Sequence, residues 1–287
     1  MSTSRNLVLV RAGAQSLHRK WLGGAARWDL AISSYASDKA ADFPEAAYFH
    51  FFKGGKWDGI AAFFAAYPGC LDQYDYVWLP DDDIDTNCMA INDIFDAMGT
   101  FGFGVMQPSL NTRSFFWHPI TLHCRFTQVR FTNFVEVMVP ALSIPVLKDL
   151  LPVFATTRSG WGIDWLWVEK ARAKNLRSGI LDSVQVLHTR PVGSALAKEM
   201  KQQGLSGVSE LSATGFENAR ALCREAIMVN GRRIHGQALC GLLQFIAQAP
   251  WMSGKRHRRS GARVYLGSLY SHLVKRQHLG KLSREQS

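Results

Sequence analysis

The sequence lacks the features that define several large classes of protein. It has no run of about 18 or more apolar residues, so it predicts no membrane-spanning helix. Met1–Asn6 has no apolar core and Leu7–Val10 is too short to supply one, so no secretory signal is expected. The five cysteines are odd in number and show no paired close spacing. This argues against a zinc site or a disulfide framework and favours a reducing cytosol as the compartment.

The chain does have enough apolar sequence for a full core. With 287 residues, 47% of them hydrophobic, it fits one large α/β domain, or one domain with a smaller appendage. Residues 251–287 hold nine Lys or Arg against one acid, which is +8 of the net charge of +10. We therefore expect an α/β domain over residues 1–195 and a helical, basic extension over residues 196–287, with helices at 216–228 and 237–249.

An acidic cluster follows one apolar segment directly. Tyr76–Leu79 is aromatic, β-branched or large and apolar throughout, which suits a central strand covered on both faces. Pro80 ends it, and four acids follow: Asp81, Asp82, Asp83 and Asp85. Ligands of open α/β sheets bind at the carboxyl ends of strands, and crowded carboxylates are best tolerated around a cation. The pattern predicts a site for Mg²⁺ or Mn²⁺; the alternative is a solvated acidic turn that caps the next helix.

Two earlier segments are candidates for contacting an anion. The expected first strand runs into Arg11 and a glycine turn, where many α/β enzymes admit a nucleotide. Further on, Lys53 and Lys56 flank two glycines and precede Trp57. Glycines let backbone amides approach a diphosphate closely, but a flexible surface turn explains the same residues equally well.

The segment Phe134–Pro140 alternates strongly and predicts a strand. Glu136 lies inside its apolar run. A buried carboxylate needs a partner, so Glu136 is either paired structurally or placed in a cleft.

Three more candidates lie downstream. Trp161 stands between two glycines and is either a core residue or an exposed platform for the apolar face of a sugar. Asp164 follows at an expected helix start, where it is either an N-cap or a site carboxylate. His188 ends a late strand beginning near Val184; a histidine there can ligate a metal, although a lone one usually does not.

Taken in order, these motifs resemble domain-of-unknown-function family 707, known in plants as the lysine-ketoglutarate reductase trans-splicing related proteins. The resemblance covers roughly residues 7–193 and is carried by these stretches: Lys53–Trp57, Tyr74–Asp83, Gln107–Leu110, Phe134–Met138, Gly160–Asp164 and Val186–His188. The family's acidic motif in plants reads Trp-Asp-Glu-Asp, whereas here Pro80 precedes three aspartates. The resemblance implies a GT-A glycosyltransferase-like α/β fold, with a mixed, mostly parallel sheet flanked by helices.

The same resemblance implies roles for individual residues. GT-A enzymes hold a divalent ion against a sugar-nucleotide diphosphate with an Asp-x-Asp strand end, which implies Asp81, Asp83 and His188 as ligands of Mn²⁺ or Mg²⁺. Asp164 is the implied catalytic base of an inverting transfer. The residues expected to bind the nucleotide sugar are Arg11, Lys53, Lys56, Trp57, Asp81 and Asp82, and those expected at the acceptor are Trp161, Gly162 and Glu136.

The expected activity is transfer of a sugar from a nucleotide-sugar donor, such as a UDP-sugar, to a glycan or lipid-linked acceptor. One alternative is nucleotidyl or phosphoryl transfer at the same metal site. Another is a non-enzymatic protein whose basic tail binds an anionic membrane or nucleic acid. Because the tail has no recognised nucleic-acid motif, the sequence favours a cytoplasmic protein held peripherally at the inner face of a membrane.

Overall fold

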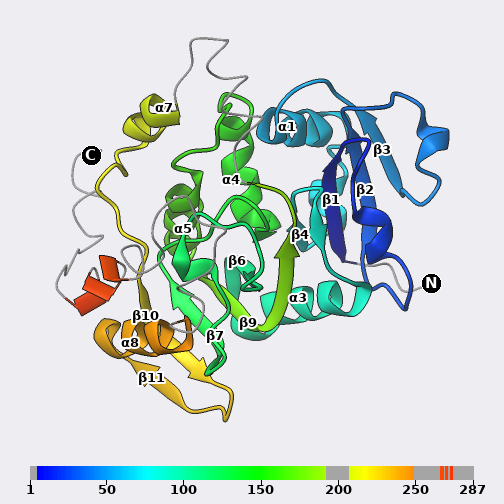
Figure 1. The fold of residues 1–287 in the computed structure, drawn as a ribbon. Coiled ribbons are helices and arrows are strands. Elements are labelled where there is room, and N and C mark those ends of the chain that lie inside the picture. Colours follow the sequence, from blue (N-terminus) through cyan, green and yellow to red (C-terminus); the bar gives the residue numbers. More distant parts are fainter. Residues whose placement is uncertain (1–4, 192–206, 249–265, 268, 271, 274–287) are drawn as a thin grey trace.

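The computed structural model describes residues 5–191, 207–248, 266, 267, 269, 270, 272 and 273. The predicted domain boundary after residue 195 and most of the basic tail lie outside these residues. The described part is built on one mixed β-sheet with helices on both faces (Figure 1). None of its helices is long and apolar enough to cross a membrane.

The sheet runs from one edge to the other in the order β3-β2-β1-β4-β8-β6-β9-β7-β10-β11. The strands in that order are β3 (Tyr48–Phe51), β2 (Asp29–Ser34), β1 (Asn6–Ala12), β4 (Tyr76–Trp78), β8 (Ala141–Ser143), β6 (Phe103–Leu110), β9 (Arg177–His188), β7 (Thr127–Thr132), β10 (Cys223–Met228) and β11 (Arg233–His235). Along this path β8, β7 and β11 run opposite to the other strands. A short strand, β5 (Ile84–Asp85), pairs with the end of β9. The sheet is mixed and flanked by helices, as expected: β8 separates the parallel groups β3-β2-β1-β4 and β6-β9, and β7 and β11 are antiparallel to their neighbours.

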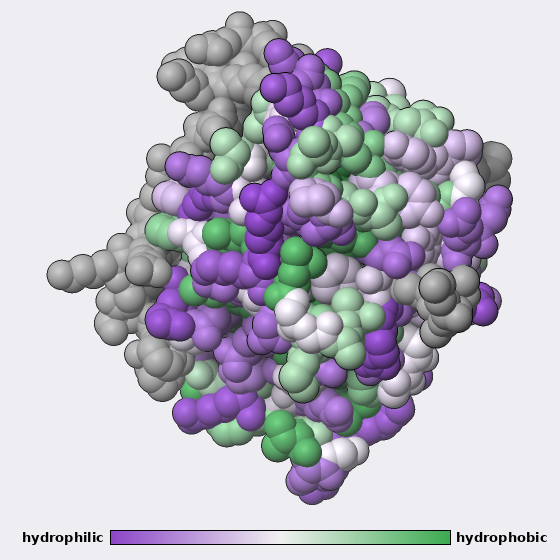
Figure 2. Space-filling view, turned by 90° about the vertical axis from the view of Figure 1, so that its right-hand side faces the viewer, coloured by the Kyte–Doolittle hydropathy of each residue, from purple (hydrophilic) through white to green (hydrophobic). Residues whose placement is uncertain are grey.

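The period of two along β1 explains the helices on both sheet faces. Val8 and Val10 point into one apolar cluster with α3 (Cys88–Phe101). Leu7 and Leu9 point into the other, which is covered by α1 (Lys56–Ala66), α4 (Ile144–Phe154) and α5 (Ile163–Ala173). The remaining described helices are α2 (Cys70–Gln73), α7 (Gly207–Thr214), α8 (Gln237–Gln248) and the short 3₁₀ segments His18–Trp21, Ala40–Asp42 and Pro119–Thr121. The edge that carries β3 shows hydrophilic and hydrophobic residues interspersed (Figure 2).

Two of the expected elements are wrong. Residues 134–140 form no strand; they are an irregular, largely buried segment, and the strand comes only afterwards as β8. Residues 223–228 of the expected helix 216–228 instead form β10, which pairs with β7. The part of the chain beyond residue 195 therefore extends the sheet and is not only helical, although α8 confirms the helix predicted at 237–249.

A buried ion pair joins the middle strands to the C-terminal helix. Arg130 on β7 and Asp182 on β9 are 1% and 2% exposed, and their side chains bond at 2.7 and 2.9 Å. Arg130 also donates to the carbonyls of Ile120 and Leu122 and to Gln244 of α8. Because each charged group is paired and hydrogen-bonded, the network can be buried without an uncompensated charge.

Candidate active site

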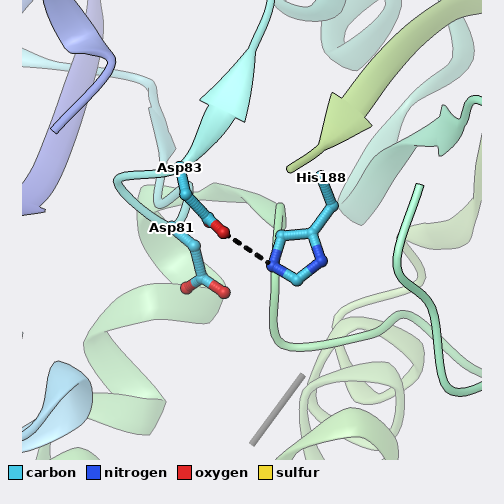
Figure 3. A group of neighbouring side chains, drawn as sticks. All are labelled: Asp81, Asp83 and His188. Atoms are coloured by element: carbon cyan, nitrogen blue, oxygen red, sulfur yellow. Dashed lines mark ion pairs between the residues drawn. The ribbon is translucent and has the colours of Figure 1, made fainter. Parts of the chain in front are cut away.

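Three potential metal ligands converge where β4 and β9 end. Asp81 and Asp83 follow β4, His188 is the last residue of β9, and one ligand atom from each lies within 4.8 Å of the other two (Figure 3). The Nε2 atom of His188 is 3.3 Å from Oδ2 of Asp83. The predicted triad is therefore assembled, although His188 is more than a hundred residues from the two aspartates in the chain.

Pairing of the backbone fixes the positions of Asp83 and His188 relative to each other. Strand β5 places Ile84 opposite His188, so the acidic turn runs against the end of β9. Thr189 donates from its backbone N–H and its hydroxyl to the Asp83 carbonyl, and Arg190 N–H donates to the Asp83 carboxylate at 3.1 Å. These contacts hold the carboxylate and the imidazole at a set separation before any ligand arrives, which is what a preorganised site requires.

The tautomer of His188 suits a metal ligand. Its Nδ1 lies 2.8 Å from the carbonyl of Phe115, to which it donates, so Nε2 faces the carboxylates. A histidine ligand usually has its second nitrogen held in this way. Burial by itself would lower the pKa of His188, but the carboxylates of Asp83 and Asp81 outweigh it and raise that pKa. Two carboxylates and one imidazole form a donor set that fits a divalent cation such as Mn²⁺ or Mg²⁺.

The predicted base is connected to this triad by hydrogen bonds. Lys56 Nζ donates to Asp81 at 2.6 Å and to the carbonyl of Val137 at 2.7 Å. The backbone N–H of the same Val137 donates to Oδ1 of Asp164 at 3.0 Å. Lys56 and Val137 therefore link Asp81 to Asp164.

Two carboxyl groups near the triad have raised pKa values. Burial raises the pKa of Asp164 to about 8, against the opposing effect of its hydrogen bonds to backbone N–H groups and of the Lys56 charge. Glu136 is 4% exposed, and its Oε2 has no hydrogen-bond partner. Burial, with the nearby charges of Asp164 and Asp81, raises the pKa of Glu136 well above its ordinary value. Glu136 forms no ion pair with the described residues, and its backbone N–H donates to the side-chain oxygen of Gln107 of β6 at 2.6 Å.

The residues Gly160, Trp161 and Gly162, called the tryptophan turn, come shortly before Asp164 in the chain. Trp161 is 45% exposed, and the glycines on either side have φ of +74° and +94°, a region that residues with a Cβ rarely adopt. A Cβ on Gly160 would come within 2.2 Å of the indole of Trp57, and one on Gly162 within 2.6 Å of Thr214. Both glycines are therefore required by backbone conformation and by packing.

A carboxylate from α7, which the sequence gave no reason to single out, secures this turn. Glu210 accepts hydrogen bonds from the hydroxyl of Thr157 at 2.6 Å and from the N–H of Ser159 at 3.0 Å. It also accepts from Arg158 N–H and the Ser159 hydroxyl. Side chains whose partners lie 29 residues away, as for Gln107, or 51–53 residues away, as for Glu210, leave no local pattern, so both could be found only in the folded chain.

Several of the residues predicted to bind the nucleotide sugar are engaged in other contacts. Trp57 is 2% exposed and packs on Phe154 and Trp167, so it is a core residue and offers no stacking surface. Lys53 is exposed just before α1, where it faces solvent. The carboxylate of Asp82 accepts a hydrogen bond from Gly13 N–H at 2.8 Å and forms an ion pair with Arg190. Asp82 therefore stabilises the turn that follows β1.

Arg11 also has a structural role. Its guanidinium donates to the hydroxyl and carbonyl of Ser33 and to the carbonyls of Phe52 and Gly54. These bonds hold the glycine loop that precedes α1. Arg11 therefore shapes this loop by donating to the carbonyls of the loop. Of the guanidinium nitrogens of Arg11, only Nε has no hydrogen-bond partner.

Fold and site together define a GT-A-like α/β protein with a carboxylate and imidazole triad at the carboxyl end of its sheet. No family model and no curated protein matches the chain, so the resemblance to family 707 remains an expectation. Among solved structures, the chain is similar to residues 1–349 of TarS from S. aureus, with 12% identity and a TM-score of 0.47 over 94% of this chain and 81% of that one. The chain is similar to the same TarS fragment in complex with UDP-GlcNAc, with 11% identity and a TM-score of 0.48 over 93% of this chain and 80% of that one.

A putative nucleotide-diphospho-sugar transferase from Desulfovibrio desulfuricans G20 is also similar, with 15% identity and a TM-score of 0.37 over 72% of this chain and 98% of that one. At these identities and TM-scores, none of the similarities assigns a ligand or a role to any residue of this chain.

Proposed function

We propose that this protein is a divalent-metal-dependent glycosyltransferase that moves a sugar from a nucleotide-sugar donor, such as a UDP-sugar, to a hydroxyl of a glycan or lipid-linked acceptor with inversion. The observation that carries the proposal is the convergence of Asp81, Asp83 and His188, with Asp164 connected to Asp81 through the hydrogen bonds of Val137 and Lys56. This arrangement would offer a cation site for a diphosphate and a carboxylate for an acceptor.

The triad would hold Mn²⁺ or Mg²⁺, which supplies a positive charge against the departing diphosphate. Lys56 is bonded to Asp81 and directs a second positive charge toward the same region. In the reaction, the acceptor oxygen forms a bond to the anomeric carbon while the bond from that carbon to the phosphate oxygen breaks. The electron pair leaves with the diphosphate.

Asp164 takes the proton that the acceptor hydroxyl loses. Its Oδ1 is held by Val137 N–H, so Oδ2 is the atom that receives the proton. A carboxyl with a pKa of about 8 is a stronger base than an ordinary aspartate once ionised. In this proposal Trp161, which is 45% exposed, would stack on the acceptor sugar, and Oε2 of Glu136, which has no hydrogen-bond partner, would accept from one of the sugar hydroxyls.

The proposal is tested by a screen of nucleotide-sugar hydrolysis with Mn²⁺ present. Asp83→Ala removes one ligand of the triad, and we expect the rate to fall about 100-fold or more. The matched control is Asp85→Ala, because Asp85 belongs to the same acidic run but pairs with Lys20 outside the triad. Hydrolysis that survives Asp83→Ala, or that does not depend on added metal, would contradict the proposal.

A further inference from the structure

One face of α8 exposes apolar side chains at helical spacing. Leu239, Leu242 and Ile246 are 45%, 44% and 44% exposed, three and four residues apart. The opposite face, with Cys240 and Gln244, is buried toward β10 and the Arg130 network. The helix sequence, QALCGLLQFIAQ, contains no charged residue. Single exposed leucines are ordinary on a protein surface, whereas an aligned row of them marks a docking surface.

A second set of exposed apolar side chains lies on a segment that packs against α8. Leu266, Tyr270 and Leu273 are 53–55% exposed and four and three residues apart. Gln237 donates to the carbonyl of His272 at 2.8 Å, and a Cβ on Gly241 would meet the His272 ring, so this segment contacts a different side of α8 from Leu239, Leu242 and Ile246. In Figure 1 the red helical pieces lie next to the orange α8. Leu239, Leu242 and Ile246 are called the apolar strip below.

Basic residues stand before and after α8 in the chain. The turn after β10 exposes Val229 (70%) beside Arg232 and Arg233, which are also exposed. Along the chain, α8 is followed by residues 251–287, whose nine Lys or Arg face one acid. Uncharged apolar helix faces flanked by basic residues bind at the interface of anionic bilayers, where apolar burial and attraction to lipid phosphates act together.

We propose that the apolar strip docks on the surface of an anionic phospholipid bilayer. A second copy of the chain fits less well, because each copy has a net charge of +10 and the like charges of two copies would repel each other. Nucleic acid fits less well too, since its phosphates gain nothing from an uncharged aliphatic face. The inference does not depend on the proposed transferase activity.

The test is co-sedimentation of the full chain with two kinds of vesicle at about physiological ionic strength. One kind is phosphatidylcholine alone, and the other is phosphatidylcholine with about 30 mol% phosphatidylglycerol. We expect binding to the anionic vesicles and little to the neutral ones. The double variant Leu242→Gln with Ile246→Gln should bind about tenfold or more weakly. Met89→Gln is the matched control, because Met89 is 73% exposed on α3, outside the apolar strip, and should leave binding unchanged. Thermal melting of each variant establishes that the fold is kept.

Three results would overturn the inference. The first is a wild type that does not bind anionic vesicles. The second is a double variant that binds as well as the wild type, which would assign binding to the basic tail alone. The third is a light-scattering mass that falls from dimer to monomer in the double variant, which would make a second copy the occupant of the apolar strip.

Discussion

Asp164 and Glu136 are carboxyl groups that burial keeps from being well solvated. Asp164 retains a hydrogen bond from Val137 N–H, which stabilises its charged form, whereas Glu136 has one oxygen with no partner at all. An unpaired polar atom in the interior costs stability, so its retention points to a task in ligand binding. The sequence placed Glu136 within an apolar run, but its setting beside Asp164 is known only from the fold.

The raised pKa of Asp164 predicts a pH dependence of stability. The folded group titrates near 8, while the unfolded group has the ordinary value of 3.8. Between about pH 4 and pH 8 the unfolded chain has released this proton and the folded chain still holds it, so stability falls as the pH rises through that window. Asp164→Asn cannot ionise and escapes this effect. In the presence of EDTA, the Tm of the variant relative to wild type should increase from pH 5 to pH 8.

The control for this prediction is Asp149→Asn. Asp149 is 38% exposed and pairs with Lys174 on the surface, so its substitution should shift Tm by the same small amount at both pH values. A difference between Asp164→Asn and wild type that does not change with pH would show that the buried carboxyl titrates normally.

At the scale of helices and strands, local sequence patterns predicted individual elements but not the contacts between elements that are distant in the chain. Strand β4 and the end of β9 follow from an apolar run and a terminal histidine. Residues 134–140 have the alternation of a strand but lie between α5 and Gln107, where Asp164 and Gln107 satisfy their backbone groups instead. Residues 223–228 look helical locally, yet the open edge of β7 pairs with them as β10.

The Arg130–Asp182 pair should be a principal support of the middle strands. Arg130→Met leaves Asp182 buried without its partner, and we expect a loss of about 3–5 kcal/mol in the free energy of unfolding, measured in urea. The surface pair Arg27–Asp96 provides the control: both side chains are more than half exposed, so Arg27→Met should cost less than about 1 kcal/mol. Equal losses in the two variants would contradict the assigned role.

The link from Glu210 to the tryptophan turn predicts local opening without global unfolding. Glu210→Ala removes the acceptor of four hydrogen bonds to residues 157–159. The loop contains Arg158, so limited digestion with trypsin should cut after Arg158 about tenfold faster or more, as mass spectrometry can follow. Glu169→Ala, which loses a surface pair with Arg172, should leave that cut unchanged. A cleavage rate at Arg158 that is the same in Glu210→Ala and wild type would refute the link.

At the scale of the whole molecule, the sheet brings distant parts of the sequence to one place. The carboxyl ends of the parallel strands β4 and β9 meet because β8 and β6 lie between them in a fixed order, and this order carries His188 to Asp83. Sequence reasoning found the triad because each ligand sits at the end of a recognisable strand. It misplaced Trp57, whose burial under the Gly160 turn depends on α4 and α5 packing around it.

The account depends most on a divalent cation at the triad, and anomalous diffraction from crystals soaked with Mn²⁺ tests this directly. We predict one peak at about 2.0–2.3 Å from Asp81, Asp83 and Nε2 of His188. We also predict its loss in Asp83→Ala. An ordered peak elsewhere, with none at the triad, would contradict the central claim.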